Sequence, residues 1–297
     1  MIINGQTLDL AFRGFKTIFS EASAEAPSHY DKIAMVVPSS SRDETYGWLG
    51  NFPTMREWVG PRQVKQFEAH GFTIRNKTFE TTVEVDRVDF EDDRLGVFKP
   101  AFAEMGQAAA RHPDEMIFSL LKNGFTSTCY DGQPFFSANH PVTDADGNVT
   151  TVSNLDEGTG PAWFLLDTSR AVRPLIWQER TGYEFQQLNG TEDEYVFRND
   201  KFLYGIRARV NAGFGLWQLA HGSKKPLGLG EYAQARAAMM ERKADGGRIL
   251  GVTPTVLVVP PALESFARQI LNCELGESGG SNPWSGTAQV LVTPYLS

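Results

Sequence analysis

The amino-acid sequence predicts a protein of the α+β class that is built from unlike parts, and three observations support this prediction. A helical pattern extends over residues 91–123, which is long for a compact domain. Just before it, residues 72–85 alternate apolar and polar side chains, as β-strands do. From residue 126 onward, short apolar runs alternate with further helical patterns. No internal repeat connects these parts.

The composition is that of an ordinary globular protein, with 41% hydrophobic and 22% charged residues among 297. No apolar run is long enough to span a membrane, and the first residues lack the features of a signal peptide. The net charge of −8 argues against a protein that functions mainly by binding DNA, because contacts to the phosphates need an excess of basic residues. Cys129 and Cys273 are far apart in the sequence, which indicates two free thiols in a reducing cytoplasm.

The first element predicted is a short amphipathic helix over residues 7–21. Leu8, Phe12, Phe15 and Phe19 recur at helical spacing. A small, polar stretch, residues 22–29, follows the helix. Such a helix is either an arm that packs on another molecule or the first helix of the core, and this segment alone leaves both open.

The second element is an extended region over residues 45–93. Phe72 and Ile74 alternate with polar residues, whereas Phe79, Val83 and Val85 alternate on the other parity. The change of phase near Asn76 predicts a turn or bulge between two strands. A ribbon with one apolar and one charged face is only marginally stable alone, so it is expected to lie on a partner subunit.

The third element is the long helix, predicted from Glu91 to Asn123 with Gly124 as its stop. Pro100 fits a first helical turn, whereas Pro113 is expected to kink or interrupt the helix. Beyond it, four strands and a fifth near the end of the chain are predicted at residues 162–166, 175–177, 195–204, 252–259 and 288–292. Two helices are predicted at residues 230–243 and from Pro260 to Leu271.

No catalytic, cofactor or metal site is predicted. Cys129 and His140, with Asp131 between them, could act as a nucleophile and a base, but no pattern fixes their geometry. The segment 228–233 fits a dinucleotide fingerprint with alanine last, yet it follows no convincing strand and is better explained as a loop before a helix. The segment 144–148 has the spacing that begins a calcium loop but lacks its final glutamate, so a turn is expected. The remaining histidines, His29, His70, His112 and His221, show no metal-ligand spacing.

Several motifs in a fixed order resemble one family. Trp58-Val59-Gly60-Pro61-Arg62, Asn76-Lys77-Thr78-Phe79-Glu80 and Val83-Glu84-Val85-Asp86-Arg87 precede the long helix. This order is similar to the projecting loop and spine helix of tailed-phage major capsid proteins. Further on, Phe135-Phe136-Ser137-Ala138-Asn139-His140-Pro141, Arg173-Pro174-Leu175-Ile176-Trp177 and Asn282-Pro283-Trp284-Ser285-Gly286 resemble the Mu-like major head subunit family. The resemblance covers essentially the whole chain.

The resemblance implies the Johnson (Hong-Kong-type) capsid fold. The implied parts are an N-terminal arm over residues 1–40, an extended β-hairpin loop over 41–92, and a peripheral domain with the spine helix over 93–150. An axial domain with returns to the peripheral domain is implied over 151–280, and a C-terminal strand over 281–297. The resemblance also implies a structural protein, not an enzyme.

The implied partners are those of capsid assembly. The chain is expected to form hexamers and pentamers with itself, which close into an icosahedral head in the bacterial host cytoplasm. A scaffolding protein, a protease and a portal protein are implied, with a decoration protein as a further candidate. Packaged DNA would be enclosed without sequence specificity, and no membrane is involved.

The residues expected at subunit interfaces are aromatic residues of the first helix and charged or aromatic residues of the loop. They are Phe12, Phe15, Phe19, Trp58, Arg62, Arg75, Lys77, Glu80, Glu84 and Arg87. Two alternatives stay open. Another phage structural protein, from the tail or a head decoration, would be smaller and richer in β-structure. A cytoplasmic hydrolase would need a cluster of titratable residues, which the sequence does not show.

Overall fold

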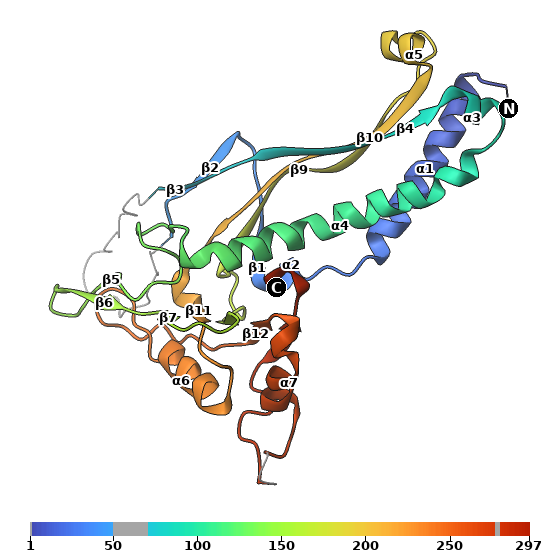
Figure 1. The fold of residues 1–297 in the computed structure, drawn as a ribbon. Helices are drawn as coiled ribbons and strands as arrows, with labels where there is room; N and C mark the ends of the chain where they lie inside the picture. The colour runs from blue at the N-terminus through green and yellow to red at the C-terminus, as the bar shows by residue number, and fades with distance from the viewer. Residues whose placement is uncertain (1, 50–70, 277–279) are drawn as a thin grey trace.

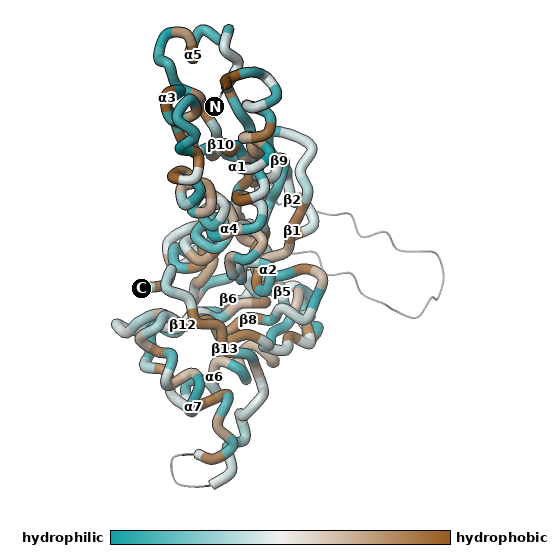
Figure 2. The backbone as a smooth tube through the Cα atoms, turned by 90° about the vertical axis from the view of Figure 1, so that its right-hand side faces the viewer, coloured by the Kyte–Doolittle hydropathy of each residue, from teal (hydrophilic) through white to brown (hydrophobic). Residues whose placement is uncertain are grey.

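The computed structural model describes residues 2–49, 71–276 and 280–297. The molecule is elongated, with helices α3 (Arg87–Glu91) and α5 (Glu194–Asn199) near one end and α6 (Leu229–Met240) and α7 (Glu264–Asn272) near the other (Figures 1 and 2). The long helix α4 (Lys99–Lys122) connects the middle of the molecule to the first end. Within the described residues, no helix is long and apolar enough to cross a membrane.

A four-stranded sheet lies along α4 in the order β1-β9-β10-β4. Its strands are β1 (Ala34–Pro38), β4 (Lys77–Asp86), β9 (Leu175–Leu188) and β10 (Lys201–Phe214). Strand β1 is parallel to β9, and the other neighbours are antiparallel. The predicted strand over residues 195–204 is wrong in its first half, because α5 occupies residues 194–199. Asp200 then takes a left-handed conformation (φ 53°), which ends the helix before β10 begins.

Helix α1 (Gly5–Glu25) packs beside α4, and both cover one face of this sheet (Figure 1). Their approach is close, because a Cβ at Gly106 would lie 2.3 Å from the carbonyl oxygen of Phe19. Helix α4 begins at Lys99 and not at the predicted Glu91, since Asp93 is left-handed (φ 56°) and the turn η1 (Leu95–Phe98) follows it. Pro100 lies in the first turn as predicted, but Pro113 does not interrupt the helix.

The other end of the molecule contains a five-stranded sheet in the order β13-β12-β8-β11-β7. The strands are β7 (Leu155–Asp156), β8 (Trp163–Leu166), β11 (Ala220–Ser223), β12 (Val256–Val259) and β13 (Gln289–Val292). Every residue of β8 and β12 is buried, and hydrophobic residues (brown in Figure 2) predominate in this part of the chain. Helices α6 and α7, both near their predicted positions, pack around the same core. A central cluster with residues from α4, β9, β10, β8 and β12 joins the two ends.

Two short hairpins complete the fold: β2 (Asp43–Tyr46) with β3 (Phe72–Arg75), and β5 (His140–Thr143) with β6 (Val149–Val152). The first corrects the predicted strand pairing. Strand β3 pairs with β2, whereas β4 pairs along its whole length with β10. The predicted change of phase does lie at Asn76, where the chain passes from the hairpin into the four-stranded sheet. A short helix α2 (Tyr30–Ile33) precedes β1, and 3-10 turns lie at η2 (Asn123–Phe125), η3 (Trp217–Leu219), η4 (Pro261–Leu263) and η5 (Pro294–Leu296).

Candidate subunit interface and a buried polar cluster

The aromatic residues of α1 pack on the chain's own core. The helix begins at a capping box, in which Asn4 and Thr7 bond reciprocally to each other's backbone. The ring of Phe15 stacks on that of Phe102 with 4.0 Å between the ring centres, and the ring centres of Phe19 and Phe185 are 5.3 Å apart. Both are almost fully buried, because their rings already have partners in the same chain. Docking of α1 on a neighbouring subunit stays a prediction. Phe12 also contacts Phe185 but is only partly buried.

The base of the β2–β3 hairpin is fixed by a buried glutamine of β9. Gln178 is fully buried and accepts a hydrogen bond from the Tyr46 hydroxyl at 2.8 Å. Its amide nitrogen donates to the carbonyl oxygen of Ile74 and to Oδ1 of Asn76, at 3.1 and 2.9 Å. Burial raises the pKa of Tyr46 to about 12, so its hydroxyl remains a donor. One side chain therefore bonds to both strands of the hairpin and to the residue that follows it.

Asn76 adds a second set of bonds at the same place. Its side chain donates to Ser39 Oγ and to the carbonyl oxygen of Ser41, and its backbone N–H donates to the carbonyl oxygen of Arg42. The hairpin, the segment before it and β9 are thus joined by buried hydrogen bonds. This polar junction was not predicted, although the change of phase at Asn76 was the signal for it.

The charged residues predicted at the interface fall into two groups. Arg75, Lys77 and Glu80 are exposed on β3 and β4. Glu84 and Arg87 instead pair within the chain: Glu84 lies 2.7 Å from Lys201, and Arg87 lies 3.4 Å from Glu91. Hydrogen bonds from Lys201 and Tyr195 hold the pKa of Glu84 below its ordinary value. Trp58 and Arg62 lie outside the described residues.

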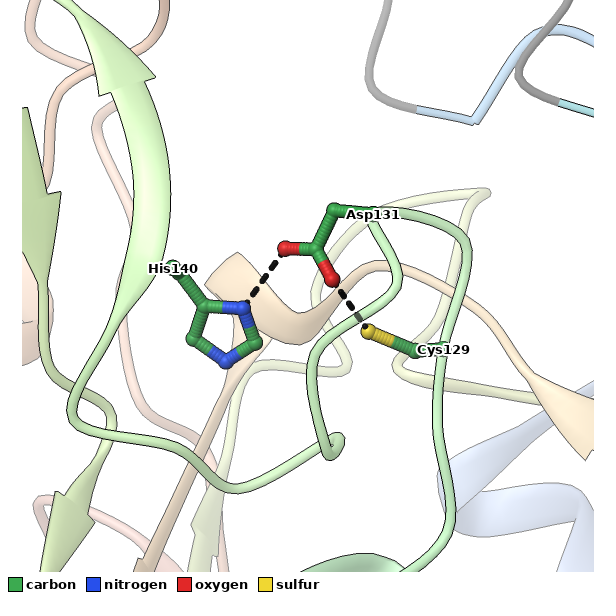
Figure 3. Close-up of side chains that lie close together, drawn as sticks. All are labelled: Cys129, Asp131 and His140. Carbon is green, nitrogen blue, oxygen red and sulfur yellow. Dashed lines mark hydrogen bonds and ion pairs between the residues drawn. The ribbon is translucent and has the colours of Figure 1, made fainter. Parts of the chain in front are cut away.

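The structure brings Cys129, Asp131 and His140 together (Figure 3). Oδ2 of Asp131 lies 2.6 Å from Nδ1 of His140, and its Oδ1 accepts a hydrogen bond from the Cys129 thiol at 3.1 Å. Cys129 and Asp131 lie in a tight turn, in which the N–H of Cys129 donates to the carbonyl oxygen of Gln133, and His140 begins β5. His140 is fully buried and stacks on the Trp217 ring at 3.9 Å.

The cluster does not have the geometry of a cysteine hydrolase. The hydrogen bond of the Cys129 thiol runs to the Asp131 carboxylate, and no bond joins the thiol to the imidazole of His140. Burial and the negative charge of Asp131 both raise the pKa of Cys129, which keeps the thiol protonated and weakly nucleophilic. Burial alone would raise the pKa of Asp131, but the bonds from His140 and Cys129 outweigh it and lower that pKa.

A second buried polar group includes Arg242, whose guanidinium carbon lies 6.0 Å from the centre of the Trp217 ring. Arg242 is fully enclosed and donates to the carbonyl oxygens of Gln218 and Ala220 at 2.6 and 2.8 Å. It also lies 3.3 Å from Nδ1 of His221, whose Nε2 donates to Asp156 at 2.9 Å. Because an arginine can only donate, His221 must be neutral with its proton on Nε2. Burial lowers the pKa of Arg242 to about 9 and also lowers the pKa of His221.

Two other sequence patterns are structural, as predicted. Gly228 is the N-cap of α6, so the segment 228–233 is a loop that enters a helix. Asp144 accepts hydrogen bonds from the backbone of Asp146 and Asn148, and Gly147 is left-handed (φ 87°). These residues form the turn between β5 and β6.

Comparison with solved structures defines the class of protein. The subunit in the procapsid of bacteriophage JBD30 matches with a TM-score of 0.88 and 46% identity, over 99% of this chain and all of that one. The subunit in the JBD30 capsid matches with a TM-score of 0.78 and 36% identity, over 94% of each chain. The fold is therefore that of tailed-phage major capsid proteins.

The sequence identifies the family. The model of the Mu-like prophage major head subunit gpT matches residues 8–296. The major capsid protein of Escherichia phage Mu is 47% identical over the full length of both chains, and the FluMu prophage head subunit of Haemophilus influenzae is 42% identical over 91% of this chain and 90% of that one. The chain belongs to the Mu-like major head subunit family and is a structural subunit of the icosahedral phage head.

Proposed function

We propose that the chain assembles into hexamers and pentamers that close around packaged DNA, with no enzymatic activity of its own. The match over 99% of the chain to a procapsid subunit carries this proposal. Assembly takes place in the bacterial cytoplasm with a scaffolding protein, a protease and a portal protein. A decoration protein is a further partner, since the related JBD30 capsid binds trimers of a minor capsid protein.

We also propose a division of the chain into parts with different roles. Residues 1–40 form the N-terminal arm, 41–92 the extended loop and 93–150 the peripheral domain with the spine helix. Residues 151–280 form the axial domain with returns to the peripheral domain, and 281–297 the C-terminal strand. Within the loop, exposed Arg75, Lys77 and Glu80 contribute ion pairs to neighbouring subunits. Each such pair stabilises a contact by only about 0–1 kcal/mol, so the shell depends on many repeated contacts.

Electron microscopy of the purified chain, with and without the scaffolding protein of its phage, tests this proposal. Rings of five or six subunits, tubes or closed shells are expected. Discrete monomers at high concentration in both samples would contradict it. A Gln178→Leu variant is a useful companion, because it should remain folded while strands β2 and β3 lose their hydrogen bonds to β9.

A further inference from the structure

The hydrogen bonds of Asn154 determine which nitrogen of His140 carries a proton. Asn154 is fully buried; its Nδ2 donates to the carbonyl oxygen of Phe135 at 2.7 Å, and its Oδ1 accepts from the N–H of Ser137 at 2.8 Å. The amide therefore cannot be turned over. Its Oδ1 faces Nε2 of His140 at 3.2 Å, so Nε2 must be the donor.

This assignment leaves the other nitrogen with a lone pair. In the neutral imidazole, the Nδ1 lone pair faces Oδ2 of Asp131 at only 2.6 Å. Two acceptors at that distance repel each other unless a positive charge lies between them. A proton or a metal ion between the two atoms relieves this repulsion.

We propose that Cys129, Asp131 and His140 bind a divalent transition-metal ion of the zinc class. A thiolate, a carboxylate and an imidazole are the three kinds of zinc ligand, and one ligand atom from each lies within 4.8 Å of the others. A metal-binding histidine usually donates its second ring N–H to a partner that orients the ring, and Oδ1 of Asn154 is that partner for His140. Trp217 covers the ring of His140 and fixes its plane.

The protons and charges balance in this exchange. Without metal, the cluster holds the thiol proton of Cys129, the proton on Nε2 of His140 and one proton shared between His140 and Asp131, with a net charge of zero. A divalent ion replaces the thiol proton and the proton between His140 and Asp131, and the net charge is again zero. Ligand atoms around zinc are separated by roughly 3.3–3.7 Å, so Asp131 must move outward by about 0.5–1 Å. Asp131 is the least buried of the three, and water from its side supplies the fourth ligand.

Cobalt(II) is the probe, because a bond between cobalt and thiolate gives a charge-transfer absorption that proton binding does not. The chelator-treated full-length chain and the Cys273→Ser variant, which removes the exposed cysteine, should both show this absorption at one equivalent of cobalt. Two protons should be released per ion. Cys129→Ser should lose the absorption, and Asp131→Asn should bind at least about tenfold more weakly.

The result for the unmodified chain is decisive even where a variant fails to fold. No thiolate absorption in the unmodified chain and in Cys273→Ser would overturn the proposal and leave a shared proton as the only cation. Loss of the absorption in Cys273→Ser would also overturn it, because the thiolate would then be the exposed one.

Discussion

The Gln178 side chain forms hydrogen bonds with both strands of the β2–β3 hairpin, so replacing it tests how much these bonds stabilise the subunit. In Gln178→Leu, the Tyr46 hydroxyl and the Asn76 amide lose a buried partner. Each unsatisfied buried group costs about 1–3 kcal/mol, so the free energy of unfolding should fall by roughly 2–4 kcal/mol. Urea denaturation of the unassembled subunit measures this loss.

Gln186→Leu is the matched control, since Gln186 is exposed on the same strand. Its effect should stay within about 0.5 kcal/mol. Hydrogen exchange should also become faster at residues 43–46 and 72–75 in Gln178→Leu only. Equal exchange in both variants would show that the junction does not hold the hairpin.

His221 makes stability depend on pH. Burial lowers its pKa in the folded chain, whereas the unfolded chain has the ordinary value near 6.5. The unfolded state therefore binds more protons as the pH falls below about 6.5, and stability is lost on acidification. The contribution is at most about 1.4 kcal/mol per pH unit.

Denaturation midpoints between pH 7 and 5.5 test this dependence. His221→Gln, which has no titrating ring, should show a smaller loss over this range than the unmodified chain. The half-buried His112, whose pKa is also lowered by burial, accounts for part of the slope that remains. An unchanged slope in His221→Gln would exclude His221 as the source.

At the scale of the elements, α1 behaves as a core helix. Phe15→Ala should destabilise the subunit by about 3–5 kcal/mol, because it removes a buried ring that stacks on Phe102 and meets Tyr204 edge-on. Leu10→Ala is the control on the same helix, since Leu10 is 70% exposed. Its effect on stability should be below about 0.5 kcal/mol. Similar stability of both variants in urea would instead indicate that α1 packs only on neighbouring subunits.

The sequence predicted elements well where periodicity decides them. Helix α1 and most of α4 follow from apolar residues at helical spacing, and β8 and β12 follow from short apolar runs. The pairing of β4 with β10 could not be predicted, because its partner is more than a hundred residues away. The start of α4 was also missed, since it depends on the left-handed conformation of Asp93.

The buried cluster was visible only in part. Cys129, Asp131 and His140 were recognised together, but no spacing indicated that the Asp131 carboxylate contacts both of the other side chains. Asn154, which fixes the tautomer of His140, is 14 residues further along the chain and belongs to no motif. The polar contacts of Gln178 were missed for the same reason, because they join residues about a hundred positions apart.

At the scale of the whole molecule, the exposed charges of β4 should matter for assembly and not for folding. Lys77→Glu should lower the yield of shells at low salt while leaving the stability of the subunit unchanged. High salt should reduce the difference, because it screens exposed charges. Lys243→Glu, an exposed lysine just after α6, is the control with the same charge change. Equal losses of shells in both variants would show a general charge effect and no specific contact of β4.

Helix α4 contacts segments from both ends of the chain: α1 packs along it, and η5 lies against its last turns, where Phe118 stacks on Tyr295 at 6.3 Å. Lys122, its last residue, also donates to the carbonyl oxygen of Ser297. In a shell stretched by pressure from within, tension applied to either segment would pass into the same helix. Such a helix bears load along its axis through its backbone hydrogen bonds, so the subunit should resist being pulled apart better than its separate contacts suggest.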